Sequence, residues 1–248
     1  MKISKIRTLW IILLSVLYSL NTSIRAIIKR FLGSISRTWV DSTLQLWVNR
    51  ILNAVKVNYK LYNPHGSEPQ PGQPTIIMCN HSSLYDIPLS LKAFPKHSVR
   101  MLAKKEMEKI PFLAGAMRAS EFPFIDRKNR RQAIKDLDAM QDLLISGIVM
   151  WVAPEGTRSK DGKLSSFKKG AFITAIQAKA TIIPIGIRGA FDILPARSLQ
   201  FNIEQTAEVH IGKAIDASKY TIEEKEALMQ LVHKEIERLV GQPSSEHL

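Results

Sequence analysis

Short apolar runs recur along the chain after residue 74, and stretches with helical patterning or turn residues separate them. Apolar runs of about four to eight residues bounded by turn signals are typical of strands buried on both faces of a sheet. Helical spacing of apolar residues over 133–144, with Gly147 placed to end the helix, predicts a helix between two of these runs. This alternation predicts an α/β fold, a three-layer αβα domain with a mainly parallel sheet. The predicted strands are 75–79, 98–103, 122–125, 148–152 and 181–187, with a further strand around Val209 and Ile211.

The sequence predicts a loop at the start of this domain and a helix at its end. The Pro- and Gly-rich stretch 63–74 predicts a loop ahead of the first strand. Thr221 and Glu224 have the spacing of a capping box, which predicts that the last helix begins at Thr221 and stops near Gly241. With 248 residues, 45% of them hydrophobic, the chain can bury a full core.

The positive charge of the chain is concentrated in its first 60 residues. The formal net charge is +13, and residues 1–60 carry +9 of it, because ten basic side chains stand against the single acid Asp41. Such a segment can bind the phosphates of nucleic acids or of anionic lipids. The apolar residues among these charges favour lipids. The basic residues are Lys2, Lys5, Arg7, Arg25, Lys29, Arg30, Arg37, Arg50, Lys56 and Lys60.

An uncharged apolar run covers residues 9–20. As a helix it is about 18 Å long, too short on its own to cross a bilayer core of about 30 Å. Amphipathic stretches follow, with Trp39 and Trp47 among apolar and basic residues, as in helices that lie in the membrane interface. We therefore predict that residues 1–60 form a two-helix membrane-associating segment and that residues 61–248 form the α/β domain.

Other interpretations of the N-terminal segment stay open at this point. A basic start followed by an apolar run also describes a secretory signal peptide, although Arg25 makes Ser23 to Ala26 a poor cleavage site. The amphipathic stretches also fit a helical hairpin that packs on the core. Nucleic-acid binding is less favoured, because no recognition helix or aromatic RNA-binding motif accompanies the charge. The single cysteine, Cys79, excludes an internal disulfide and fits a reducing compartment.

A group of polar residues comes directly after the first predicted strand: Asn80, His81 and Asp86. In α/β sheets, sites form where strands end and helices begin. Histidine suits general base catalysis near neutral pH, and a carboxylate can hold its ring in one tautomer. Residues five apart in a helix point about 140° apart. We therefore expect His81 to lie outside the helix, with Ser82 or Ser83 near the N-cap, and to fold back towards Asp86.

Two further polar clusters follow later strands. Arg127, at the end of the third, could bind a phosphate through two nitrogen atoms. After the fourth, Gly156 permits a positive φ angle, and Glu155 could orient Arg158 or bind a substrate hydroxyl. The apolar strand around Pro184 could line a pocket or be a plain edge strand. Taken singly, these features also fit solvated loops, surface ion pairs and a histidine that lies near a carboxylate by chance.

The order and spacing of these clusters resemble the glycerolipid acyltransferase family, in particular its 1-acylglycerol-3-phosphate acyltransferases. That family is marked by Asn-His-x4-Asp, by a segment ending in Phe-Ile-Asp-Arg, by Pro-Glu-Gly-Thr-Arg-Ser and by a late strand with Pro. The resemblance covers about residues 55–215. The matching residues are Asn80, His81, Asp86, 124–127, 154–159 and Pro184, and Lys105-Glu106, Ile110-Pro111 and 167–170 are also similar to family sequence.

The resemblance implies an enzyme that transfers a fatty acyl group from acyl-CoA or acyl carrier protein to the sn-2 hydroxyl of lysophosphatidic acid, giving phosphatidic acid. It implies His81 as the general base, Asp86 as its partner, and no acyl-enzyme on Ser82 or Ser83. Membrane lipids are the expected partners, at the cytoplasmic face of the plasma (inner) membrane, and no cofactor, metal ion or nucleic acid is expected. The residues implied at the substrate are Asn80, Lys105, Arg127, Glu155, Gly156, Thr157 and Arg158.

Alternatives to this activity are another lysolipid acceptor, such as a lyso-ornithine lipid or a lysophosphatidylcholine-type substrate, and a non-catalytic membrane-binding scaffold with the same fold. The chain also departs from the family pattern at two places. A Gly usually opens the second block where this chain has Ser120-Glu121-Phe122, and an aromatic residue often precedes the third where Ala153 stands. We expect the first departure to bear on loop geometry and the second on a pocket wall.

Overall fold

The computed structural model of the chain describes residues 3–241, with the backbone alone at position 130. Lys2 and the outer ends of the two predicted segments lie outside the described residues. The helices are α1 (Lys5–Phe31), α2 (Arg37–Ala54), α3 (Asp86–Ala93), α4 (Leu113–Ala119), α5 (Arg130–Ile145), α6 (Gly170–Gln177), α7 (Ala190–Ile193) and α8 (Lys225–Val240), with the 3-10 helices η1 (Lys105–Lys109) and η2 (Ala217–Lys219). The strands are β1 (Asn58–Tyr62), β2 (Thr75–Cys79), β3 (Val99–Met101), β4 (Ala103–Lys104), β5 (Phe124–Ile125), β6 (Val149–Val152), β7 (Thr181–Arg188), β8 (Thr206–Ile211) and β9 (Ile215–Asp216).

The main sheet is mostly parallel, as predicted. Its strands lie in the order β1-β8-β7-β2-β6-β3, and β2 pairs in parallel with both β6 and β7. The antiparallel pairs are β7 with β8 and β7 with the short β9. Because β2 and β6 run in the same direction, the loops that follow Cys79 and Val152 leave the sheet at one edge. That edge brings two of the predicted polar clusters together.

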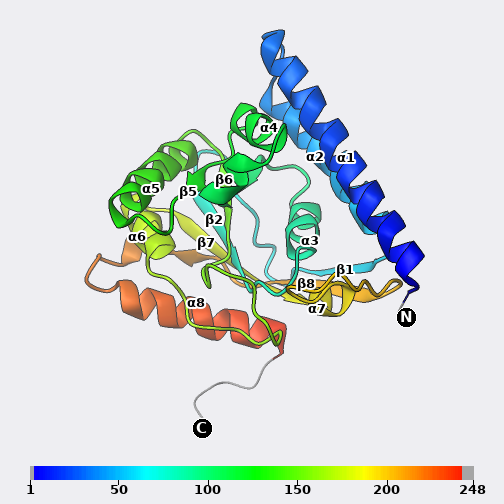
Figure 1. The fold of residues 1–248 in the computed structure, drawn as a ribbon. Helices are drawn as coiled ribbons and strands as arrows, with labels where there is room; N and C mark the ends of the chain where they lie inside the picture. The colour runs from blue at the N-terminus through cyan, green and yellow to red at the C-terminus, as the bar shows by residue number, and fades with distance from the viewer. Residues whose placement is uncertain (1–2, 242–248) are drawn as a thin grey trace.

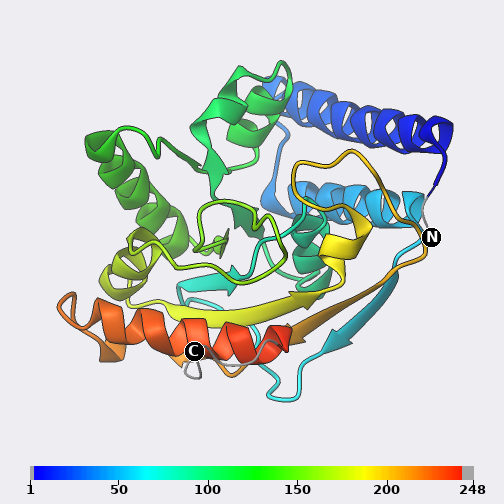
Figure 2. The same ribbon diagram turned by 60° about the horizontal axis from the view of Figure 1, so that its bottom comes forward.

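Alternate side chains of the central strands enter two separate cores. In β2, Ile77 and Cys79 face the core shared with α2 and α3, whereas Ile76 and Met78 face the core shared with α5, α6 and α8. All five residues of β2 are buried, which is why its sequence is a continuous apolar run. Figure 2 shows the sheet between α8 on one side and α2 and α3 on the other. The predicted three-layer αβα architecture is therefore confirmed.

One predicted strand differs from those observed, and one observed strand was not predicted. The stretch 98–103 holds two strands, of which β3 lies in the main sheet and β4 pairs with β5 in a separate two-stranded sheet. The sequence does not predict β1, because Lys60 interrupts its apolar pattern and most of its side chains are exposed at the edge of the sheet. β1 is held from one side, by parallel pairing with β8.

The last helix begins later than predicted. The Glu224 carboxylate accepts the Thr221 backbone N–H at 2.8 Å, so one half of the expected capping box forms. The residues between them form a turn, and α8 begins at Lys225. Its predicted end is confirmed, because Gly241 caps it in the left-handed conformation at φ 71.

The two N-terminal helices pack differently. α1 is a continuous 27-residue helix that runs along the outside of the molecule (Figure 1) and buries Ile11, Ser23 and Ala26. Within residues 3–241 it is the one helix long and apolar enough to cross a membrane, a criterion that signal sequences near an N-terminus also meet. By contrast, α2 contributes Val48 and Leu52 to the first core. The predicted boundary at residue 60 therefore does not separate two packing units.

The outward side of α1 is apolar along its whole length. Its exposed hydrophobic residues recur every three or four positions, which places them on one face of the helix. The helix contains no acidic residue, and its last turn carries Lys29 and Arg30. The exposed residues are Ile6, Leu9, Trp10, Leu13, Val16, Leu17, Leu20, Ile24, Ile28 and Phe31.

Two arginines connect α2 to the segment that precedes β5, Arg37 of α2 directly and Arg100 of β3 from between them. Arg37 binds Glu121 through two hydrogen bonds of 2.7 Å. The buried Arg100 binds Asp41 of α2 at 2.7 Å and the Ser120 carbonyl at 2.6 Å. Glu121 takes the left-handed backbone conformation at φ 63. The family that this sequence resembles usually has a glycine in the stretch 120–122. This chain therefore keeps the backbone conformation that favours glycine, and the Glu121 side chain binds α2.

This arrangement predicts an order of stability for two variants at position 121. Glu121→Ala and Glu121→Gly both lose the ion pair with Arg37, but only the alanine keeps a Cβ atom in the left-handed region. We expect the alanine variant to be less stable than the glycine variant by about 1 kcal/mol in the free energy of unfolding, measured by urea denaturation. Equal stability of the two variants would contradict the assigned backbone conformation.

Candidate active site

The predicted pair of His81 and Asp86 forms at the end of β2. His81 lies in the loop outside the helix, and its Nδ1 lies 2.8 Å from Oδ2 of Asp86, the first residue of α3. The same oxygen accepts the backbone N–H groups of Ser82 and Ser83, each at 2.7 Å. The N-cap itself is Tyr85, so the two serines lie ahead of the position expected for them. The Asp86 carboxylate is therefore the group that organises this loop.

This geometry gives the imidazole a defined role. A carboxylate accepts hydrogen bonds, so Nδ1 of His81 carries the proton and Nε2 is left to accept one. Asp86 is fully buried, and the His81 side chain keeps 16% of its surface exposed. The edge of the ring contacts Trp151 of β6, with ring centroids 5.7 Å apart. A reachable base held in one tautomer is what general base catalysis requires.

Glu155, in the loop after β6, points inwards at the His81 loop. Its Oε1 accepts the His81 backbone N–H at 2.7 Å. Its Oε2 accepts both the backbone N–H and the hydroxyl of Ser165, at 3.0 and 2.7 Å. In return, Ser159 N–H donates to the His81 carbonyl at 2.7 Å. The carboxylate is almost fully buried, and burial raises the pKa of Glu155. This geometry favours a role in joining the two loops over the predicted contact with a substrate hydroxyl.

Asn80 also has an internal role. Its side chain donates to the Ile187 carbonyl at 2.9 Å and accepts the Ile187 N–H at 2.8 Å. These bonds tie the end of β2 to β7, and the residue is buried. The geometry favours a positioning role for Asn80 over the predicted contact with substrate.

Cationic side chains surround Gly156. Arg127 donates from Nη1 to the Gly156 carbonyl, and Gly156 takes φ 74. A Cβ atom added to Gly156 would lie 3.4 Å from Cγ of Lys168. Arg158 is half-buried, and its guanidinium forms no hydrogen bond or ion pair with any residue that the structure describes. The structure thus brings Arg127 and the loop of Arg158 together, as their predicted shared role requires.

The other predicted site residues lie at the rim or away from it. Lys105 is exposed and pairs with Asp126 at 3.3 Å, and Thr157 is exposed in the loop after β6. Pro184 is buried in β7, where its carbonyl accepts the Gly212 N–H at 2.9 Å. It does not line either of the two hollows described next.

An apolar cavity of about 340 Å³ adjoins the His81 loop. Its wall includes Tyr85 and Ile87, the two neighbours of Asp86 in the sequence, together with side chains from α1, α2 and α4 and from the segment around Phe201. The sequence did not predict this cavity, since its wall comes from segments distant in the chain. One signal was available: residues 15, 19, 22 and 23 are all Ser or Thr, and this spacing marks one small-residue face of α1.

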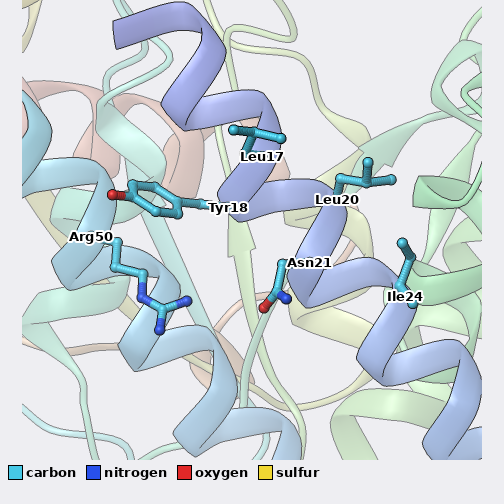
Figure 3. Close-up of a pocket in the computed structure, with 6 residues that line it drawn as sticks. All are labelled: Leu17, Tyr18, Leu20, Asn21, Ile24 and Arg50. Atoms are coloured by element: carbon cyan, nitrogen blue, oxygen red, sulfur yellow. The ribbon is translucent and has the colours of Figure 1, made fainter. Parts of the chain in front are cut away.

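A wider hollow lies away from this chemistry. Figure 3 shows it between α1 and α2, where Tyr18, Asn21 and Arg50 meet Leu17, Leu20 and Ile24. The Arg50 guanidinium lies over the Tyr18 ring, 5.6 Å from its centre. The hollow is open and offers no base or nucleophile, so the His81 loop remains the candidate site. Within residues 3–241, no three His, Cys, Asp or Glu side chains converge as a metal site would require.

Comparisons with known proteins agree with this geometry. A family model described as "Acyltransferase" matches residues 62–188. The putative 1-acyl-sn-glycerol-3-phosphate acyltransferase acl-2 of Caenorhabditis elegans is 30% identical over 159 residues, covering 64% of this chain and 56% of the relative. The chloroplastic 1-acyl-sn-glycerol-3-phosphate acyltransferase LPAT1 of Arabidopsis thaliana is 34% identical over 163 residues, covering 65% and 45%. The chain thus spans about half the length of these curated relatives.

The fold also matches a solved structure. The crystal structure of the 1-acyl-sn-glycerophosphate acyltransferase PlsC from Thermotoga maritima superposes with a TM-score of 0.77. The match covers 97% of both chains at 24% sequence identity. It therefore extends over the N-terminal helices as well as the α/β core.

The inward position of Glu155 predicts a pH dependence of stability. Because burial raises the pKa of Glu155, the folded protein retains a proton that the unfolded chain releases at the ordinary glutamate pKa. The contribution of this group to the free energy of unfolding therefore falls as the pH rises between those two pKa values. We expect Glu155→Gln, which does not titrate, to remove this fall when urea denaturation is measured from pH 4.5, the ordinary glutamate pKa, upwards.

The matched control is Glu106→Gln. The pKa of this exposed carboxyl is lowered, first by a backbone hydrogen bond, so its replacement should leave the fall in place. A wild-type protein and a Glu155→Gln variant with parallel pH profiles would contradict the predicted effect of burial.

Proposed function

The chain belongs to the acyltransferase family, and we propose that it transfers a fatty acyl group from a thioester donor to the free hydroxyl of lysophosphatidic acid, giving phosphatidic acid. The observation that carries the proposal is the His81–Asp86 pair, 2.8 Å apart, with Nε2 free to accept a proton. The matched relatives are named for this reaction.

In the proposed mechanism the acceptor hydroxyl is the nucleophile. Nε2 of His81 takes its proton as the oxygen attacks the thioester carbonyl, and the buried Asp86 carboxylate stabilises the imidazolium that forms. The tetrahedral intermediate collapses, the C–S bond breaks, and the imidazolium returns the proton to the leaving thiolate. No acyl-enzyme is needed. Because Asp86 occupies the N–H groups of Ser82 and Ser83, the oxyanion must take its hydrogen bonds from other donors.

We assign the acceptor phosphate to Arg158 and Arg127, with Gly156, Thr157 and Lys105 around them. Arg158 supports this assignment because a half-buried guanidinium without a protein partner is suited to bind an anion. Arg127 uses one N–H on the Gly156 carbonyl and keeps its other donors.

The apolar cavity beside the His81 loop supports a place for a fatty acyl chain. Its wall is almost entirely apolar, and two of its hydroxyls bond within α1: Ser15 donates to the Ile11 carbonyl at 2.7 Å and Ser19 to the Ser15 carbonyl at 2.8 Å. An acyl chain in this cavity would have its carboxyl end near the base.

We further propose that the protein works at a membrane surface. The exposed apolar face of α1 and its basic last turn support an in-plane orientation, because the opposite side of the helix packs on the domain. The basic N-terminal segment favours the anionic cytoplasmic face of the inner membrane. There the acceptor and the product are both dissolved in the bilayer.

Variants of the catalytic pair test the reaction. We expect His81→Ala to lower kcat for transfer to lysophosphatidic acid by roughly 10²–10⁴-fold. Asp86→Asn keeps an oxygen that can accept the loop N–H groups but loses the charge, so it should also lower kcat while the protein stays folded by circular dichroism. His65→Ala, in the exposed loop before β2, is the control and should be fully active. Wild-type rates in His81→Ala would exclude the mechanism.

Variants of Arg158 test the acceptor site. We expect Arg158→Ala to raise the KM for lysophosphatidic acid by about 10–100-fold, the worth of a lost charge-assisted hydrogen bond, and to leave the KM for the donor unchanged. Arg158→Lys should recover part of the loss, since it keeps the charge without the two-pronged geometry. Arg238→Ala, on α8, should have no effect. A change confined to the donor KM would reassign Arg158 to the donor.

A further inference from the structure

An exposed aromatic residue sits in a strained turn just ahead of α4. Phe112 has φ 62 and ψ −38, and the Leu113 N–H donates to the Pro111 carbonyl at 2.7 Å. These features define a classic γ-turn centred on Phe112, a turn type that is rare and strained. A non-glycine residue keeps such a conformation when other interactions offset the strain energy. The Phe112 side chain is 57% exposed, so packing within the protein offsets only a small part of that strain.

The turn lies beside the outward apolar face of α1. Ile110 and Phe112, on either side of Pro111, are both exposed. The helix that follows, α4, packs on the C-terminal half of α1, where the Ile27 side chain lies 3.5 Å from the position of a Cβ on Gly115 (Figures 1 and 2). The turn is therefore continuous with a surface that already exposes Ile24, Ile28 and Phe31 of α1.

The charges around this surface indicate which kind of partner it fits. Lys109 precedes the turn, and it is exposed and forms no ion pair within the described residues. Lys29 and Arg30 close α1, and no acidic residue occurs before Asp41. Nearby, Glu108 is paired with Arg118 at 2.6 Å. Aromatic and aliphatic side chains flanked by cations that have no acidic partner among the described residues match a bilayer that contains anionic lipids.

We propose that the 110–112 turn is a second membrane contact, which inserts Phe112 and Ile110 into the bilayer beside α1. This rests on the proposed membrane location of the enzyme. The turn follows η1, which begins at Lys105, and β4 pairs with β5, which leads to Arg127. Two contacts at separate points fix both the depth and the tilt of a body on a membrane, whereas α1 alone leaves rotation about its axis free. The turn thereby sets the height of the phosphate-binding side chains above the lipid.

A site-specific probe tests the contact directly. Cys79 is fully buried and is the single cysteine, so a thiol-reactive fluorophore on the full-length Phe112→Cys variant labels position 112 selectively. On vesicles of phosphatidylcholine and phosphatidylglycerol we expect the emission to shift to the blue, and quenching by aqueous iodide to fall several-fold. The matched control is Leu231→Cys, an exposed position on α8, on the side of the molecule away from α1, where quenching should not change.

The outcomes separate this inference from the proposed function. A label at 112 that stays open to iodide on vesicle-bound protein overturns the second contact and leaves the role of α1 intact. Protein that fails to sediment with the vesicles overturns the membrane location, and this inference with it. Neither readout depends on acyl transfer.

A second variant tests the contact by relieving the backbone strain at position 112. Phe112→Gly removes the aromatic side chain and relieves the backbone, so we expect a higher melting temperature together with several-fold slower acyl transfer to acceptor in vesicles. Transfer to acceptor in detergent micelles should be unchanged, because the variant leaves the site intact. Equal rates in vesicles for the variant and the wild type would overturn the proposal even if the melting temperature rises.

Discussion

One buried carboxylate oxygen organises the candidate active site. Oδ2 of Asp86 accepts the imidazole of His81 and two successive backbone N–H groups, all at 2.7 to 2.8 Å. The same three bonds that fix the ring also fix the loop that carries it. The hydrogen bonds that fold the loop therefore also orient the base, and they hold the carboxylate charge facing the imidazole. Because Asp86 opens α3, the helix dipole adds to the stabilisation of this charge.

The second constraint is the contact between loops that leave neighbouring strands. Parallel β2 and β6 deliver the His81 loop and the Glu155 loop to one edge of the sheet. Glu155 then bonds to the backbone of His81, and Ser159 bonds back to the carbonyl of the same residue. The loop with Gly156 and Arg158 is thereby fixed relative to the base. The distance between the proposed phosphate site and the His81 imidazole thus depends on the buried Glu155 carboxylate and on backbone contacts, which a substitution of surface side chains leaves intact.

The sequence predicts most strands of the sheet and the pairing of His81 with Asp86 well, because both signals are local. A strand buried on both faces is a plain apolar run, and a base five residues from its carboxylate lies in a single loop. The parts it does not predict depend on distant contacts. β1 is defined by its pairing with β8, and the internal roles of Asn80 and Glu155 depend on Ile187 and Ser165. The late start of α8 has a different cause, since a capping hydrogen bond at Thr221 closes a turn as readily as it starts a helix.

The position of α2 has a consequence for how this chain could be divided. Its apolar side enters the same core as β2, and Arg100 is buried against its Asp41. A fragment that starts after α2 would expose that core and leave a buried guanidinium without its carboxylate. The connection between α1 and α2, at residues 32–36, separates α2 from a helix that buries only Ile11, Ser23 and Ala26 of its own residues. Evolution or an engineer could exchange α1 there, while α2 has to stay with the α/β core.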